Sequence, residues 1–221
     1  MALTGRQRDP AAEFTEEGAL MFTISVKANT QPAVDYLNSV AKGLGDRAIV
    51  SSLNKTMAQA RTQMIRGITK EFAITYSKVA ERLRIIKARK AGMQFSATLV
   101  GNPEGRNKRA MNLTYFVAAK ATVKAWKKQA GKGGGFSRPQ IQFRIKRGKG
   151  LTHIKGAFIL NKAGQPVVRW DSRGKLVGVT TVGVPQMFMA KKVQVPIQQW
   201  IDSEFPRIFD REARYFLSTV K

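Results

Sequence analysis

Lysine and arginine are the residues whose number and spacing could do chemistry in this sequence, and that chemistry is anion binding. Residues 78–150 contain nineteen of them against Glu81 and Glu104, in a chain of 221 residues with a formal net charge of +25. The electrostatic field of so many positive charges attracts polyanions, and binding releases the counterions of the polyanion. A merely solubilising surface usually mixes both signs of charge. The segment therefore predicts contact with DNA, RNA or an acidic protein surface.

A glycine-rich segment, 131–136, follows several of these lysines. It lacks the Gly-Lys-Ser/Thr ending of a phosphate loop, and no apolar strand precedes it. It is expected to be either a basic loop that contacts phosphates without sequence preference or a disordered hairpin tip. The residues predicted to contact nucleic acid or an acidic partner are Lys120, Lys124, Lys127, Lys128, Lys132, Arg138, Arg144, Lys146, Arg147 and Lys149.

Residues for acid–base or metal chemistry are scarce. His153 is the single histidine and has no acidic neighbour in the sequence, so a structural role is expected, because general acid–base catalysis needs a positioned partner. The absence of cysteine excludes disulfides and thiolate metal sites. Of fourteen acidic residues, four lie in the first seventeen positions and four between Asp202 and Glu212. We therefore expect no enzyme activity, no catalytic residue, no cofactor and no metal site.

The composition predicts one folded domain behind an N-terminal extension. The chain is 43% hydrophobic, which is enough for a proper core. No apolar run is long enough to span a membrane, and the N-terminus lacks the apolar core that is typical of a signal peptide. Residues 1–20 are polar and acidic, so we expect a disordered or non-native extension, with Met21 as the natural start. Residues 21–221 are expected to form a single α+β domain.

Within that domain, hydrophobic periodicity predicts helices first. A strand pattern begins at Phe22, and a short helix is expected over 31–41. A longer helix follows, with Asp46 as its cap and an apolar stripe along about six turns. Another short helix is expected over 77–83. The stripe consists of Leu53, Met57, Ala60, Met64 and Ile68.

From residue 93 the period changes from helical to alternating. Residues 140–146 form the clearest strand pattern, with apolar residues on one face and basic residues on the other. Turn signals at hairpin spacing imply an antiparallel sheet over 93–190, after strand and helices in 21–92. The other strands are expected at 93–100, 111–118, 154–160 and 167–170.

The last segment, 191–221, reads as a helix with a wide apolar stripe. Pro206 lies inside the stripe and is expected to kink or restart the helix. The stripe is either a core face or a contact between subunits. The residues predicted for a subunit interface are Trp200, Phe205, Phe209 and Phe216.

Three segments resemble a known family. The stretch SLNKTMAQARTQMIRGITKEFAITYSKVAERLRI (52–85) resembles the ALNKTA-x-x-x-RT helix and the following I-x-x-x-x-V-x-x-x-L-x-I segment of the minor tail protein Z family of phages with long non-contractile tails. HIKGAFIL (153–160) and VPQMF (184–188) resemble its RGAF and SVPQMF segments, in the same order. The sequence departs from the family pattern in two places, at 179–183 and in the long lysine-rich stretch 120–132.

The resemblance implies a structural virion protein that completes the tail at the head–tail junction and is made in the host cytoplasm. It implies an α+β fold, with N-terminal helices packed on an antiparallel sheet and a C-terminal helix. The implied partners are tail terminator or head–tail connector proteins, and packaged double-stranded DNA. A homo-oligomer is also implied, a hexameric ring by analogy with neck components. Whether the basic face meets the genome end or an acidic ring stays open.

Two other classes of protein are considered as alternatives to a structural tail protein. A non-specific nucleic-acid-binding module of the ribosome-associated type would be monomeric and would carry stacking aromatics on its basic strands. Trp126 and Phe136 are the only aromatic residues set among the lysines. A nuclease or lytic enzyme would need clustered carboxylates or a partnered histidine.

Overall fold

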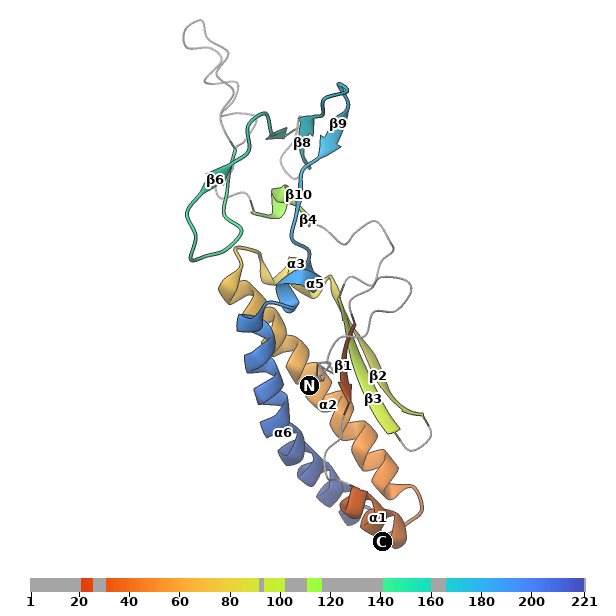
Figure 1. Ribbon diagram of the computed structural model, residues 1–221. Helices are drawn as coiled ribbons and strands as arrows, with labels where there is room; N and C mark the ends of the chain where they lie inside the picture. The colour runs from red at the N-terminus through yellow and green to blue at the C-terminus, as the bar shows by residue number, and fades with distance from the viewer. Residues whose placement is uncertain are drawn as a thin grey trace, which may run out of the picture.

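Two long antiparallel helices form the body of the protein. The computed structural model describes residues 21–25, 31–91, 94–101, 111–116, 141–159 and 166–220. Helix α2 spans Leu44–Glu71 and helix α6 spans Lys191–Ser218. They lie side by side along the molecule, and their opposite directions bring the start of α6 beside the end of α2 (Figure 1).

Helix α2 forms because its apolar residues recur every three or four positions. All five residues of the predicted stripe are buried, which confirms that prediction. The predicted start was wrong: α2 begins at Leu44, behind Gly43 with φ 78°, and Asp46 lies in its first turn. The side-chain oxygen of Asn38 accepts the N–H of Gly45 at 2.9 Å, so a residue of the preceding helix satisfies a donor of the first turn.

Helix α6 runs through Pro206 without a break, so the predicted restart was wrong. Pro206 is exposed, while its neighbours Phe205 and Phe209 are buried against the body. The missing backbone donor therefore lies on the solvent side, and the apolar stripe keeps the helix packed against α2. The helix follows a gentle curve along α2 in Figure 1.

A three-stranded antiparallel sheet packs mainly on helix α2. Its order is β1 (Met21–Ser25), β3 (Gln94–Gly101), β2 (Leu83–Ala91). The sequence pattern did not predict β2, because its pairing register shifts between Ile86 and Arg89 and interrupts the alternation. The side chain of Asn54 on α2 accepts the N–H of Ala88 in this irregular stretch at 2.8 Å.

Three short helices complete the body. The predicted helix over 31–41 is confirmed as α1. The short helix predicted over 77–83 is present but ends at Ala80, because Arg61 donates from its side chain to the carbonyls of Ala80 and Leu83 and leads the chain into β2. The bounds are α1 Gln31–Val40, α3 Tyr76–Ala80 and α5 Val184–Phe188.

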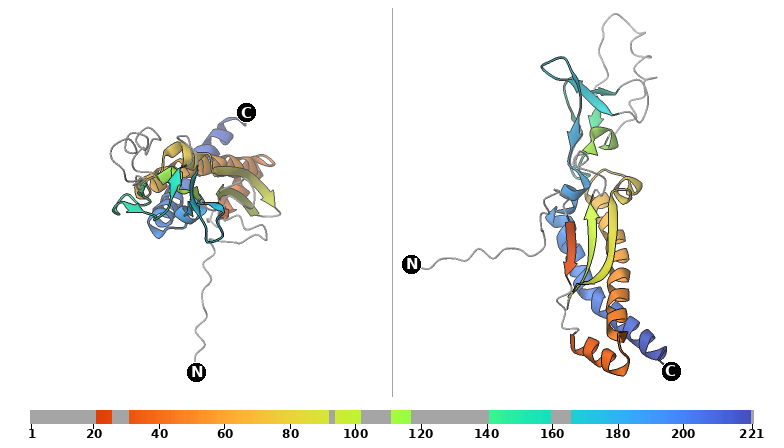
Figure 2. Two further views of the ribbon diagram at one scale, coloured as in Figure 1. Left: turned by 90° about the horizontal axis from the view of Figure 1, so that it is seen from above. Right: turned by 90° about the vertical axis from the view of Figure 1, so that its right-hand side faces the viewer.

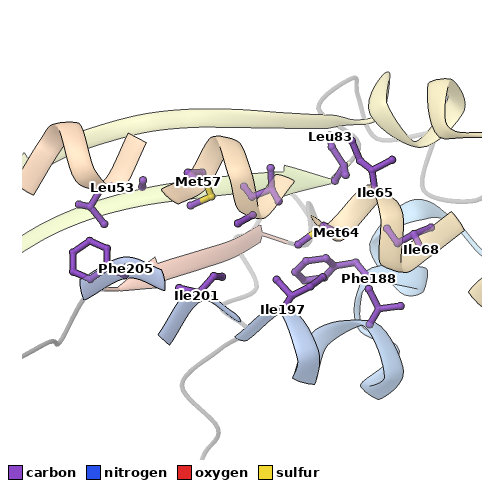
Figure 3. Packing of buried hydrophobic residues seen from close by; sticks show 14 of the residues in the cluster. Leu53, Met57, Met64, Ile65, Ile68, Leu83, Phe188, Ile197, Ile201 and Phe205 are labelled. Atoms are coloured by element: carbon purple, nitrogen blue, oxygen red, sulfur yellow. The ribbon is translucent and has the colours of Figure 1, made fainter. Parts of the chain in front are cut away.

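The main core lies between the two long helices and the sheet. Leu53 and Met57 of α2 point toward Ile201 and Phe205 of α6 in Figure 3. Burial of these side chains from water is the main stabilising contribution to the body.

Small strands form a second region beyond α3 and α5, seen at the upper end in Figures 1 and 2. We call residues 111–116, 141–159 and 166–181 the β subdomain. It has its own small core, which consists of Leu113, Ile141, Phe143, Val167 and Val179. The strands are β4 (Met111–Asn112), β5 (Gln142–Phe143), β6 (Thr152–His153), β7 (Phe158–Ile159), β8 (Val167–Trp170), β9 (Leu176–Gly178) and β10 (Thr180–Thr181).

The β subdomain contains three small sheets where the sequence predicted one. The sheets are β10–β4, β5–β6 and β7–β8–β9, and every pairing is antiparallel. The strand at 167–170 is confirmed. The described part of 111–118 turns after Asn112 into a 3₁₀ helix, η1 (Leu113–Phe116), because the Asn112 side chain accepts the N–H of Thr114 at 3.0 Å.

The strand predicted over 154–160 is shorter than expected. Residues 154–157 form a turn that contains Gly156 with φ 77°, and β7 covers only Phe158–Ile159. The overall class is nevertheless the predicted one, an α+β fold with helices on an antiparallel sheet and a C-terminal helix. No helix among the described residues is long and apolar enough to cross a membrane.

Candidate interface for an anionic partner

Of the strand predicted over 140–146, only Gln142–Phe143 forms a strand, β5, so the predicted length was wrong. The segment that begins at Ile141 nevertheless has the predicted apolar and basic faces. Ile141 and Phe143 are buried in the small core, whereas Arg144 and Lys146 are exposed. The backbone N–H of Arg144 donates to the carbonyl of Phe116 at 3.0 Å. The alternation therefore turns the cations outward while the apolar residues hold the segment in place.

The end of this segment is also fixed to the C-terminus of helix α2. The N–H of Ala73 donates to the carbonyl of Ile145, and the N–H of Arg147 donates to the carbonyl of Glu71, both at 2.9 Å. The Arg147 Nε donates to the carbonyl of Thr69 at 2.7 Å. Arg147 thus satisfies carbonyls that a helix end leaves unpaired, and its charge lies at the negative end of the helix dipole.

Lys146 takes part in the same junction. It forms a β-bridge with Phe72, and its Nζ lies 5.9 Å from the centre of the Phe72 ring. The predicted partner contacts Lys146 and Arg147 therefore have a structural role that sequence reasoning missed. No sequence pattern reveals it, because the contacts join residues that are distant in the chain.

Every lysine and arginine in the described ranges of the β subdomain is exposed. Against them, Asp171 is the single acidic residue in the described ranges of the subdomain. The residues predicted from the sequence to contact a partner end at Lys149, so the later cations of the subdomain were missed. The segment Asp171–Gly174 has the composition of a turn and could have indicated the hairpin that carries Arg169, Arg173 and Lys175. The exposed cations are Arg144, Lys146, Arg147, Lys149, Lys155, Arg169, Arg173 and Lys175.

The remaining predicted contact residues lie outside the described residues: Lys120, Lys124, Lys127, Lys128, Lys132 and Arg138. His153 is exposed on β6, opposite Gln142. Within the described ranges, no group of three or more histidine, cysteine, aspartate or glutamate residues is arranged to hold a metal ion.

A second group of cations lies on the helical body, beside the β subdomain. Two of them lie over the ring of Tyr115, with Lys78 Nζ at 5.9 Å and Arg82 Cζ at 5.7 Å from its centre. The edge strand β2 adds the exposed cations Arg84, Lys87 and Arg89. Charges on an edge strand discourage pairing with other strands, so these residues have a structural explanation of their own.

The residues predicted for a subunit interface fall into two pairs. Phe205 and Phe209 are only 3% and 6% exposed, and their rings stack with centres 6.2 Å apart inside the body's own core. Trp200 and Phe216 are partly exposed. Trp200 lines a groove of about 640 Å³ between α2 and α6, whose edges carry Arg66, Lys70 and Lys192.

A buried carboxylate joins the two long helices at the opposite end. Glu212 of α6 accepts hydrogen bonds from Ser51 and Lys55 of α2, at 2.8 Å and 2.6 Å. Burial alone would raise the pKa of Glu212, but the hydrogen bonds from Lys55 and Ser51, together with the charges of Lys55 and Arg211, lower that pKa overall. The contacts of Glu212 with Ser51 and Lys55 therefore hold α6 against α2 and have a structural role, distant from the β subdomain. We call them the Glu212 clamp.

Comparison with known proteins identifies one family. The sequence model described as prophage minor tail protein Z (GPZ) matches residues 27–220, which is nearly the whole chain. Neither the curated proteins nor the solved structures gave a significant match.

Proposed function

This chain belongs to the prophage minor tail protein Z family, and from that premise we propose that it completes the phage tail at the head–tail junction, where its β subdomain contacts an anionic partner. Membership of this family assigns the chain a structural role in the phage tail. The position at the junction and the anionic partner are our proposal.

The observation that carries the proposal is the near absence of acidic residues among the exposed cations of the β subdomain. The β subdomain exposes eight cations against Asp171 in its described ranges. The described part of the C-terminal helix mixes both signs, with pairs such as Arg207–Glu204 and Arg214–Asp210. A polyanion or an acidic ring would therefore be attracted to the β subdomain and to the cations of the body beside it.

Two anionic partners are available at such a junction. One is the end of the packaged genome, which Arg144 and Lys149 would contact through phosphates without reading sequence. Neutralising about six phosphates would make binding weaken by orders of magnitude between about 50 and 200 mM salt. The other is an acidic tail-terminator or connector ring, against which the charges would steer docking and set the register.

Self-assembly is part of the proposal. By analogy with neck components, the assembly would be a hexameric ring. Such a closed ring needs a heterologous contact, in which two different surfaces of neighbouring subunits meet. Since Phe205 and Phe209 are used within the subunit, we place the subunit contact at Trp200 and Phe216, which keep exposed surface.

The test is removal of the gene from the phage that encodes it. We expect filled heads and full-length tails that fail to join, as seen by electron microscopy of the lysate, and we expect supplied wild-type protein to restore joined particles. Tails of altered length, or normal virions without the protein, would overturn a role at the junction.

A further inference from the structure

The hairpin formed by β8 and β9 carries an apolar face that the small core does not use. Val167 and Val179 point into that core. The alternate positions form the other face, where Trp170 pairs directly with Leu176 and Val168 pairs with Phe158. Since side chains alternate along a strand, these four residues share one side of the sheet.

The outer end of this face is open to solvent. Trp170 is 55% exposed and Leu176 is 43% exposed. The ring of Phe158 lies beside Trp170, with centres 6.4 Å apart. A large aromatic side chain and an aliphatic one are thus held next to each other on the surface, although burial of such groups is strongly favourable.

The turn that ends the hairpin is well ordered by its own hydrogen bonds. The Asp171 Oδ1 accepts the N–H groups of Arg173 and Lys175, at 2.9 and 2.8 Å. Gly174 has a φ of 71°, which suits a residue without a side chain. The apolar pair is therefore presented in a preorganised form, which lowers the entropy cost of binding.

The hairpin also carries three exposed cations: Arg173 and Lys175 lie in the turn next to the pair, whereas Arg169 lies on β8 and points to the opposite side of the sheet. Arg169, Arg173 and Lys175 form no ion pair with any described residue, and the carboxylate of Asp171 is engaged by the turn. Aromatic residues with arginine beside them are the usual centres of protein interfaces. The apolar pair therefore has positive charge beside it at the turn, so its complement is an apolar recess with acidic groups next to it.

We infer that this hairpin is a docking element for an acidic protein surface of the tail, with Trp170 and Leu176 filling an apolar recess in that surface. The inference rests on the proposed function and deepens it by naming a protein partner for this part of the β subdomain. A DNA duplex offers phosphates to the cations, but its backbone has no recess for Trp170 and Leu176. Single-stranded DNA would stack on Trp170 yet would leave Leu176 without a contact.

The test uses purified tails assembled without this protein as the probe. Wild-type protein and the variants Trp170→Ala and Leu176→Ser are titrated against the tails in sedimentation assays. Each variant is expected to bind at least about tenfold more weakly, as for a central interface residue, with unchanged affinity for a 20-base-pair duplex as probe. The control is Tyr36→Ala on α1, which removes a 65% exposed aromatic residue from the helical body and should bind tails normally.

The outcomes separate the two claims. If wild-type protein does not bind the tails, both the proposed function and the docking inference fail. If wild type binds and both hairpin variants bind equally well, the docking inference fails while the proposed function stands. If the variants lose affinity for duplex or single-stranded DNA as strongly as for tails, the occupant is nucleic acid and the inference is overturned. Thermal melting of each variant checks that the fold is intact.

Discussion

The Nε of Arg147 donates to the carbonyl oxygen of Thr69 at 2.7 Å, although 78 positions separate the two residues. This contact places a residue of the basic segment on the last turn of helix α2. Together with the backbone bond from Arg147 to Glu71, it fixes the orientation of the segment relative to the helical body. Arg147, a cation predicted to contact a partner, therefore also connects the β subdomain to the helical body.

Arg147→Ala should weaken this joint. The variant loses one hydrogen bond to a helix carbonyl and a favourable charge at the helix C-terminus, which together contribute about 1 kcal/mol. Thermal melting should show the loss, and hydrogen exchange should show faster exchange of the Ala73 and Arg147 amides. Arg144→Ala is the matched control, because its side chain has no hydrogen bond within the described residues. Equal effects of the two variants would contradict the role of Arg147.

Two glycines of helix α2 should respond to alanine with opposite signs. A Cβ at Gly45 would lie 2.5 Å from the backbone oxygen of Val34, so Gly45→Ala should destabilise the protein by about 1–3 kcal/mol. A Cβ at Gly67 would meet the side chains of Val193 and Ile197 at 3.5 and 3.9 Å, which is ordinary contact. Gly67→Ala should therefore stabilise the helix by about 0.5–1 kcal/mol. Urea denaturation of both variants measures the signs, and a stabilising Gly45→Ala would refute the close approach of α1.

The Glu212 clamp should make stability depend on pH in the acid range. Because the folded protein lowers the pKa of Glu212 below its ordinary value, its stabilising contribution is complete above that ordinary value. The contribution is lost as the pH falls through the lowered pKa. Glu212→Gln should therefore lower the melting temperature at neutral pH, and the difference from wild type should shrink in acid. Glu204→Gln, which removes an i,i+3 partner of Arg207, should change little at either pH.

The affinity for duplex DNA, and its dependence on salt, should show whether the exposed cations of the β subdomain contact phosphates. If the β subdomain contacts phosphates, Lys149→Glu should weaken duplex binding for every sequence and reduce the slope of log affinity against log salt by about 0.9. Lys42→Glu makes the same change of charge in the turn between α1 and α2, at the end of the body opposite the β subdomain (Figure 1), and should leave the slope unchanged. A salt slope that Lys149→Glu does not alter would assign Lys149 to a protein partner.

The local part of the fold could be predicted from the sequence. The stripe of α2 follows from the helical period and is confirmed. The alternation of buried and exposed residues from Ile141 is also present, but only Gln142–Phe143 of that predicted strand forms a strand. Strand β2 could not be predicted, because its register shift depends on Asn54 of α2, which is 34 positions from Ala88. The restart predicted at Pro206 was wrong because packing against α2 outweighs the loss of one backbone hydrogen bond.

The candidate site was only partly predictable for the same reason. Charge density along the sequence identified the basic region but could not show that Arg147 caps a helix. The apolar pair Trp170 and Leu176 depends on the pairing of two strands, so the two residues look unremarkable in the sequence. Non-local contacts decide which members of a charged segment serve the fold and which remain free for a partner.

The most direct test of a role at the head–tail junction is an electron cryomicroscopy map of the virion neck. We predict density for the two long helices at the head-proximal end of the tail, with the β subdomain directed at the genome end or at an adjacent acidic ring. Density for this chain only along the tail tube or at the distal tip would contradict the account.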